Sequence, residues 1–82
     1  MYRVKLTARA WRELSKIRGR DAERIAGALE GLRENPRPTG ARKLRGPLHR
    51  LRTGTRRIIY AVFDKDRLVL AGSIARRPKG GE

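Results

Sequence analysis

Hydrophobic and polar residues alternate at the start of the chain. Tyr2, Val4 and Leu6 fall on one face of an extended segment, and Arg3 and Lys5 fall on the other. Because side chains of a strand point to opposite faces in turn, this pattern predicts a short, half-buried strand over residues 2–6.

Two helices are predicted next. Thr7 is a suitable N-cap for the first helix, which Gly19 ends. Its apolar residues recur at helical spacing: Ala10, Trp11, Leu14 and Ile17. The same spacing predicts a core position for Trp11 rather than stacking on a base. Asp21 is expected to cap a second helix that runs to about Glu34, and the short connection predicts an antiparallel helical hairpin.

The second half of the chain predicts three more strands. Residues 35–40 carry two prolines and a glycine and read as a loop. Residues 48–63 read as a β-hairpin, and residues 67–74 as a last strand after a turn. The predicted fold class is α+β, in the order β-α-α-β-β-β, with the helical hairpin on one face of a mostly antiparallel four-stranded sheet. We expect one domain, residues 1–77, followed by a frayed tail, residues 78–82.

Net charge narrows the choice of partner. The chain has 22 basic and 8 acidic residues in a total of 82, a formal charge of +14. This favours a polyanion, first nucleic acid, then an anionic membrane surface or an acidic protein, over a merely solvated basic surface. With no cysteine and one histidine, the sequence predicts no metal and no other cofactor. It shows neither a signal-peptide pattern nor an apolar run of about 20 residues, so a cytoplasmic location is expected.

The predicted hairpin concentrates this charge. No acidic residue occurs between Asn35 and Phe63. A two-residue turn at Gly54-Thr55 would pair Arg52 with Arg57 and place Arg50 on the same face, the one that the helices leave open. Opposed like charges destabilise a sheet, so phosphate binding explains the three arginines best. A solvated edge that discourages strand pairing is the alternative.

The last strand has a predicted register of its own. Pairing Phe63 with Arg67 sends Leu68, Leu70 and Ile74 to the core and Val69, Ala71 and Ser73 to the open face. Continued alternation places Arg77 on the open face too.

The candidate chemistry is phosphoryl transfer. The sequence shows no catalytic carboxylate pair and no Ser/His/Asp set, and Asp64 and Asp66 are expected to form a turn. An arginine cluster can position a phosphate and stabilise the charge that builds on it, while RNA supplies its own nucleophile, the 2′-OH. His49 alternates with Leu51 toward the covered face, so a structural role is expected, with an acid/base role as the alternative.

The hairpin also carries a family resemblance. The run Lys43-Leu44-Arg45-Gly46, then Arg50-Leu51-Arg52, Gly54 and Arg57-Ile58-Ile59-Tyr60-Ala61-Val62, resembles the RelE/ParE superfamily of toxin–antitoxin toxins, with a better fit to the RelE branch. The resemblance implies a RelE-like microbial RNase fold and a ribosome-dependent mRNA endoribonuclease, an mRNA interferase. Such toxins cut mRNA in the ribosomal A site without metal, inhibit translation and are neutralised by a cognate antitoxin.

The resemblance also implies roles for individual residues. Those implied in catalysis are Arg50, Arg52, Arg57 and Arg77. Those implied in contacts with mRNA or ribosomal RNA are Lys43, Arg45, Arg56 and Arg76. Many family members end in a tyrosine shortly after the last arginine, and residues 78–82 contain none. Guanidinium groups are poor proton donors, so either charge stabilisation carries the chemistry or activity is weak. The alternative is a protein of the same fold that acts on DNA gyrase, as ParE does, or only binds RNA or antitoxin.

Overall fold

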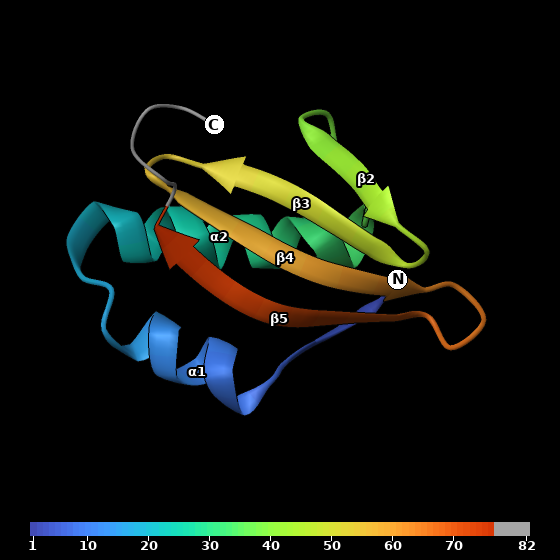
Figure 1. Ribbon diagram of the computed structural model, residues 1–82, viewed down its shortest axis with the longest axis horizontal. Helices are drawn as coiled ribbons and strands as arrows, with labels where there is room; N and C mark the ends of the chain where they lie inside the picture. Colours follow the sequence, from blue (N-terminus) through green and yellow to red (C-terminus); the bar gives the residue numbers. More distant parts are fainter. Residues whose placement is uncertain (77–82) are drawn as a thin grey trace.

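The computed structural model contains two helices and five strands (Figure 1) and describes residues 1–76. In chain order they are β1 (Arg3–Leu6), α1 (Ala8–Ser15), α2 (Gly19–Glu34), β2 (Ala41–Arg45), β3 (Leu48–Thr53), β4 (Arg56–Phe63) and β5 (Leu68–Arg76). The predicted domain boundary at residue 77 and the tail at 78–82 lie outside the described residues and stay predictions.

The strands form a single sheet in the order β1-β5-β4-β3-β2. β1 runs parallel to β5, and the other neighbours are antiparallel. The α+β class is thus confirmed, but the predicted count of four strands is wrong. The additional strand, β2, reads Ala-Arg-Lys-Leu-Arg and has no apolar alternation, and its place at the sheet edge leaves most of it exposed.

The helices cover one face of the sheet, with α2 crossing behind the strands in Figure 1. The core on that side includes Ile25, Leu32, Leu51, Ile58, Tyr60, Val69 and Ile74. Thr7 caps α1 as predicted, since its hydroxyl oxygen accepts a hydrogen bond from the Ala10 backbone N–H at 3.1 Å. The N-cap of α2 is Arg18 rather than Asp21, which lies in the first turn.

Trp11 is the clearest departure from the predicted core. Its side chain is 59% exposed, whereas Ala10 and Ile17 are buried. Trp11 instead lines a groove together with Val4, Leu6 and Leu14. Trp11 is therefore left at the margin of the core.

The register of β5 also differs from the prediction. Phe63 pairs with Leu68, so the turn has four residues, and Arg67 takes a positive φ of 50° in it. This one-residue change buries Val69 and turns Leu68 to the open face. A bulge opposite Ile59 and Tyr60 then returns Ile74 to the core.

A polar cluster holds the end of the sheet where β4 turns into β5. Arg37 donates two hydrogen bonds to Asp64, at 3.2 and 2.8 Å, and the Tyr2 hydroxyl donates a third at 2.6 Å. The bonds from Arg37, and then that from Tyr2, lower the pKa of Asp64 from 3.8 to about 2. The Tyr60 hydroxyl donates to the Pro36 carbonyl at 2.8 Å, so the loop before β2 is fixed to the core.

Candidate nucleic-acid interface

The β3–β4 hairpin has the register that the sequence predicted. Arg52 lies opposite Arg57, and Thr53 lies opposite Arg56. Gly54 has a φ of 60° at the first turn position, which glycine adopts without strain and which a type II′ turn requires. The turn therefore fixes which hairpin side chains face the helices and which face away.

Arginines occupy two adjacent rows across the open face. In the first row Arg52 and Arg57 lie side by side, followed by Ala75 on β5. The second row, two residues along each strand, consists of Arg42, Arg50, Ile59 and Ser73. We call these four arginines, Arg42, Arg50, Arg52 and Arg57, the arginine rows. Arg42 was not among the predicted site residues, because the sequence pattern of β2 does not predict a strand and so does not place Arg42 beside Arg50.

Three of the four row arginines take part in no ion pair within the described part of the chain. Among residues 1–76, the ion pairs are Arg9–Glu13, Arg24–Asp21, Arg33–Glu30 and Arg37–Asp64. None of these involves Arg42, Arg50 or Arg57. Cross-strand neighbours on one face lie about 4.5–5.5 Å apart at Cβ, so the rows gather positive charge within a few ångströms. Such a surface suits an anion with several oxygens, such as a phosphodiester.

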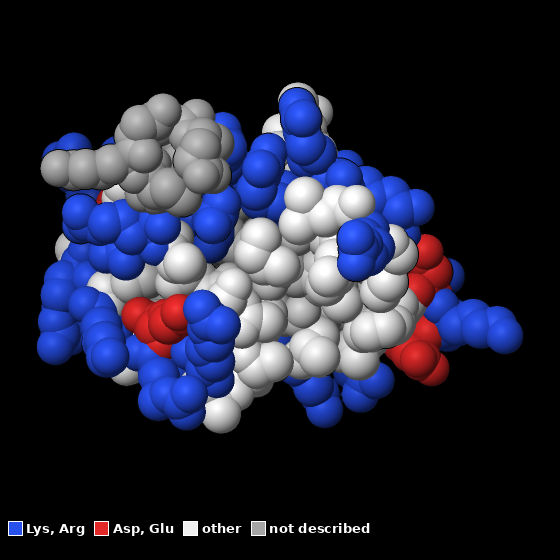
Figure 2. Space-filling model, viewed as in Figure 1, with Lys and Arg blue, Asp and Glu red and all other residues white. Residues whose placement is uncertain are grey.

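The remaining open face is largely apolar. The next row along the strands contains Leu48, Ala61 and Leu70, and beyond it Phe63 pairs with Leu68. Leu48 and Phe63 are 39% and 37% exposed. Figure 2 views this face and shows uncharged residues across its centre with lysine and arginine around the rim. The arginine rows thus border a largely apolar surface on the same face of the sheet.

His49 and Tyr60 lie on the other side of the sheet. Their rings stack with centroids 5.5 Å apart, His49 is 4% exposed, and its Nδ1 lies 2.9 Å from the Pro47 carbonyl oxygen. Burial raises the pKa of Tyr60 above its ordinary value. These contacts hold the hairpin against the core, and they direct both rings away from the arginine rows. In the described part of the two rows, the one hydroxyl belongs to Ser73.

The predicted RNA-contact residues do not form one patch. Lys43 and Arg45 are exposed on β2, where Lys43 lies opposite His49 and Arg45 opposite Leu48. Arg45 therefore shares the open face, and Lys43 points to the other side. Arg56 and Arg76 lie opposite each other on β4 and β5 and also belong to the helix side. Arg77 lies outside the described residues.

A second apolar surface opens on the helix side, at the β1 edge. Val4 and Leu6 of β1, Trp11 and Leu14 of α1, and Ala26 and Leu29 of α2 line a groove of about 280 Å³, with Glu30 and Arg33 at its rim. β1 pairs only with β5, so its outer edge is unpaired in the described sheet. We call this feature the Trp11 groove.

Comparison with solved structures identifies the fold. The isolated RelE toxin of E. coli superposes with a TM-score of 0.84 at 24% identity, covering 98% of this chain and 88% of that one. RelE in the archaeal RelE–RelB complex of Pyrococcus horikoshii OT3 gives 0.84 at 24% identity, covering 96% and 98%. The intact E. coli RelBE toxin–antitoxin complex gives 0.80 at 26% identity, covering 96% and 100%. No protein-family model and no curated protein matches the sequence. The chain has the fold of the RelE toxins.

Proposed function

We propose that this protein is the toxin of a type II toxin–antitoxin system and that it cleaves mRNA on the ribosome. The observation that carries the proposal is the pair of arginine rows, four guanidinium groups from three strands on a sheet face that the helices leave uncovered. The RelE fold supports the assignment, since its structural neighbours are toxins, free or bound to RelB. Arg77 is proposed as a further catalytic arginine from the family resemblance alone.

In the proposed reaction the scissile phosphate lies over the first row. The 2′-oxygen of the preceding ribose attacks phosphorus, and the bond from phosphorus to the 5′-oxygen breaks. The products are a 2′,3′-cyclic phosphate and a 5′-hydroxyl, and water carries the proton from the first oxygen to the second. Arg52 and Arg57 stabilise the charge on the non-bridging oxygens, and Arg50 and Arg42 hold the adjacent phosphate. No metal is part of this scheme.

The described rows contain no side chain that transfers protons, and this lowers the expected rate of mRNA cleavage. Guanidinium groups stay protonated at all working pH values, so they act through charge and position. General acid–base catalysis contributes typically about 10²–10⁴-fold, and the described rows offer no side chain for that contribution. We therefore expect slow cleavage that depends on how the ribosome positions the message, and a cytoplasmic site of action. No helix of the described chain is long and apolar enough to span a membrane.

The antitoxin is the second proposed partner, and the Trp11 groove is its proposed docking surface. The groove offers an apolar floor and an unpaired strand edge, and a partner of opposite charge is favoured by the +14 of the whole chain. An amphipathic, acidic segment has both properties. Trp11 would be buried in that complex.

One experiment separates this function from its main alternative. Purified protein is incubated with translating ribosomes on a defined message, and cuts are mapped by primer extension, with supercoiling by DNA gyrase assayed in parallel. We expect cuts at fixed positions within codons and unchanged gyrase activity. An uncut message together with blocked supercoiling would replace the proposal by a ParE-like function. An uncut message with active gyrase would leave a protein that only binds.

A further inference from the structure

Two of the predicted RNA-contact residues lie on the opposite side of the sheet from the arginine rows. Arg56 alternates with Ile58, and Arg76 with Ile74, and both isoleucines are buried under the helices. Arg56 and Arg76 are direct cross-strand partners. Two positively charged side chains therefore lie side by side at the end of the sheet. They lie on the face whose neighbouring residues form the hydrophobic core.

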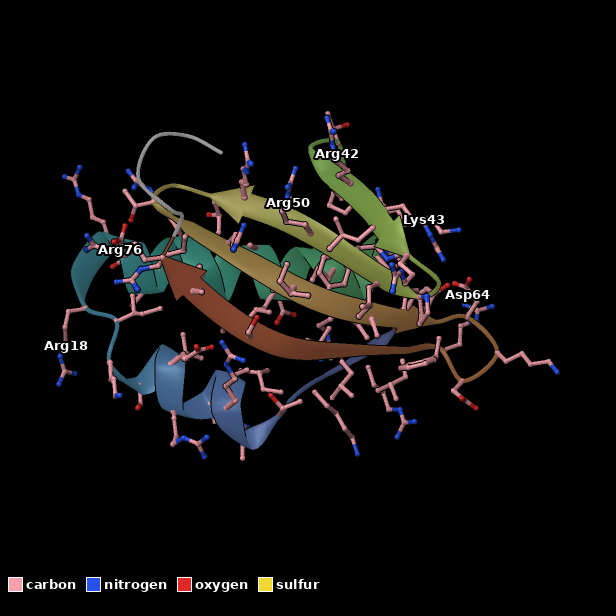
Figure 3. All side chains as sticks on the ribbon, viewed as in Figure 1. Arg18, Arg42, Lys43, Arg50, Asp64 and Arg76 are labelled. Atoms are coloured by element: carbon pink, nitrogen blue, oxygen red, sulfur yellow. The ribbon has the colours of Figure 1, made fainter. Side chains whose placement is uncertain are left out.

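The start of α2 lies beside this end of the sheet. The Thr55 hydroxyl lies 3.5 Å from an Asp21 carboxylate oxygen, and a Cβ built on Gly54 would lie 3.2 Å from Nη1 of Arg24. Arg18 is the residue that precedes α2. In Figure 3 Arg18 and Arg76 lie at one end of the molecule and Asp64 lies at the other. We call the cross-strand pair of Arg56 and Arg76 the end cluster.

The end cluster is not neutralised by the described part of the chain. Asp21 is nearby, but its ion pair is with Arg24, at 3.5 Å. Within residues 1–76 no ion pair involves Arg56 or Arg76. The Nε of Arg56 is shielded from solvent and has no hydrogen-bond partner among the described residues. The described residues therefore leave the charge of Arg56 without a compensating carboxylate.

We propose that the end cluster is a second phosphate-binding subsite for the same RNA strand, one that binds nucleotides flanking the cut and takes no part in the chemistry. The inference rests on the proposed function. It follows from continuity: Arg57 ends the first arginine row, and Arg56, the next residue, points to the other side of the same strand end. An RNA backbone that leaves Arg57 across the end of β4 therefore meets Arg56 and Arg76 directly. Arginine suits this task because its fork can bind two phosphate oxygens.

The test compares binding of short and long RNA. Fluorescence anisotropy is measured with single-stranded oligonucleotides of about 4 and about 12 nucleotides, which span the range of sites on small nucleic-acid-binding folds. The end variant is Arg56→Gln with Arg76→Gln. The control variant, Arg33→Gln with Lys65→Gln, removes the same charge from the other end of α2 and from the β4–β5 turn.

We expect the end variant to bind the long oligonucleotide about tenfold more weakly than wild type does. The slope of log affinity against log salt concentration should fall by about one to two for this oligonucleotide. Binding of the short oligonucleotide should be unchanged. The control variant should change the affinity for each oligonucleotide by less than about twofold. The inference is overturned if the end variant binds the long RNA like wild type, or if the end and control variants weaken it equally. It is also overturned if the end variant binds RNA normally but loses its inhibition by antitoxin, because the cluster would then be a protein contact.

Ribosome assays of the same variants keep the two proposals distinct. If the end variant raises the concentration of programmed ribosomes needed for half-maximal cleavage and leaves the maximal rate unchanged, both proposals stand. If wild type shows end-dependent RNA binding but never cuts the message, the subsite stands and the cleavage proposal fails. If the message is cut and the end variant binds and cuts like wild type, cleavage stands and the subsite fails.

Discussion

Arg52 and Arg57 lie directly opposite each other on β3 and β4, on the sheet face that carries no helix. Like charges in this relationship oppose folding, so the arrangement is expected to stabilise something other than the free chain. We propose that a bound phosphodiester is stabilised by the two guanidinium groups.

Arg57→Gln should separate stability from function. Removing one member of the opposed pair should raise the free energy of unfolding by up to about 1 kcal/mol, measured by urea titration. Loss of a group that stabilises transition-state charge should lower the cleavage rate on programmed ribosomes by about 10²–10³-fold. A variant that loses both stability and activity would instead mark Arg57 as a structural residue.

Arg42→Gln should weaken RNA binding, although the sequence patterns gave Arg42 no role. Arg42 lies beside Arg50 in the second row, so its loss should reduce the salt dependence of binding by about one phosphate contact. Lys65→Gln is the matched control, since Lys65 lies in the β4–β5 turn, away from the rows. Equal losses in the two variants would show that only net charge matters.

Asp64→Asn should remove an acid-sensitive part of the stability. The pKa of Asp64 is lowered in the folded protein from 3.8 to about 2. The stabilisation is therefore complete above about pH 4 and is lost as the pH falls through about 2. Urea titrations from pH 7 to pH 2 should show the variant less stable at neutral pH and equal to wild type at the acid end. Asp66→Asn, in the same turn but in no ion pair among the described residues, should behave like wild type.

Trp11 provides a spectroscopic check on the groove. With its side chain 59% exposed, the free protein should emit as a solvated indole and be quenched readily by iodide. Binding of the antitoxin should shift the emission to shorter wavelength and protect it from quenching. Trp11→Ala should weaken inhibition by the antitoxin and leave cleavage by the free toxin unchanged. Emission from the antitoxin complex identical to that of the free protein would place the antitoxin elsewhere.

Local rules predicted the hairpin well because its turn and its alternation agree. Gly54 fixed the turn, and the buried Leu51, Ile58 and Tyr60 fixed which face each arginine takes. The same reasoning placed His49 on the covered side. The local sequence is therefore sufficient to predict the register of this hairpin.

Other elements depended on contacts that no local pattern encodes. β2 is a strand because β3 offers it an edge, and its own residues do not alternate. The register of β5 follows from the positive φ of Arg67 and from a bulge. Trp11 lies on the apolar stripe of α1, but its side chain is 59% exposed. Likewise, the pairing of β4 with β5 is needed to show that the arginine rows and the end cluster lie on opposite faces of the sheet.

The most direct test of the account is single-turnover cleavage of mRNA on programmed ribosomes, with a normal message and one carrying a single 2′-deoxynucleotide at the mapped cut. The normal message should yield a 2′,3′-cyclic phosphate and a 5′-hydroxyl, and the 2′-deoxy message should stay intact at that position. Arg57→Gln should slow the first reaction by about 10²-fold or more. Cleavage of the 2′-deoxy message at the normal rate would contradict the proposed mechanism.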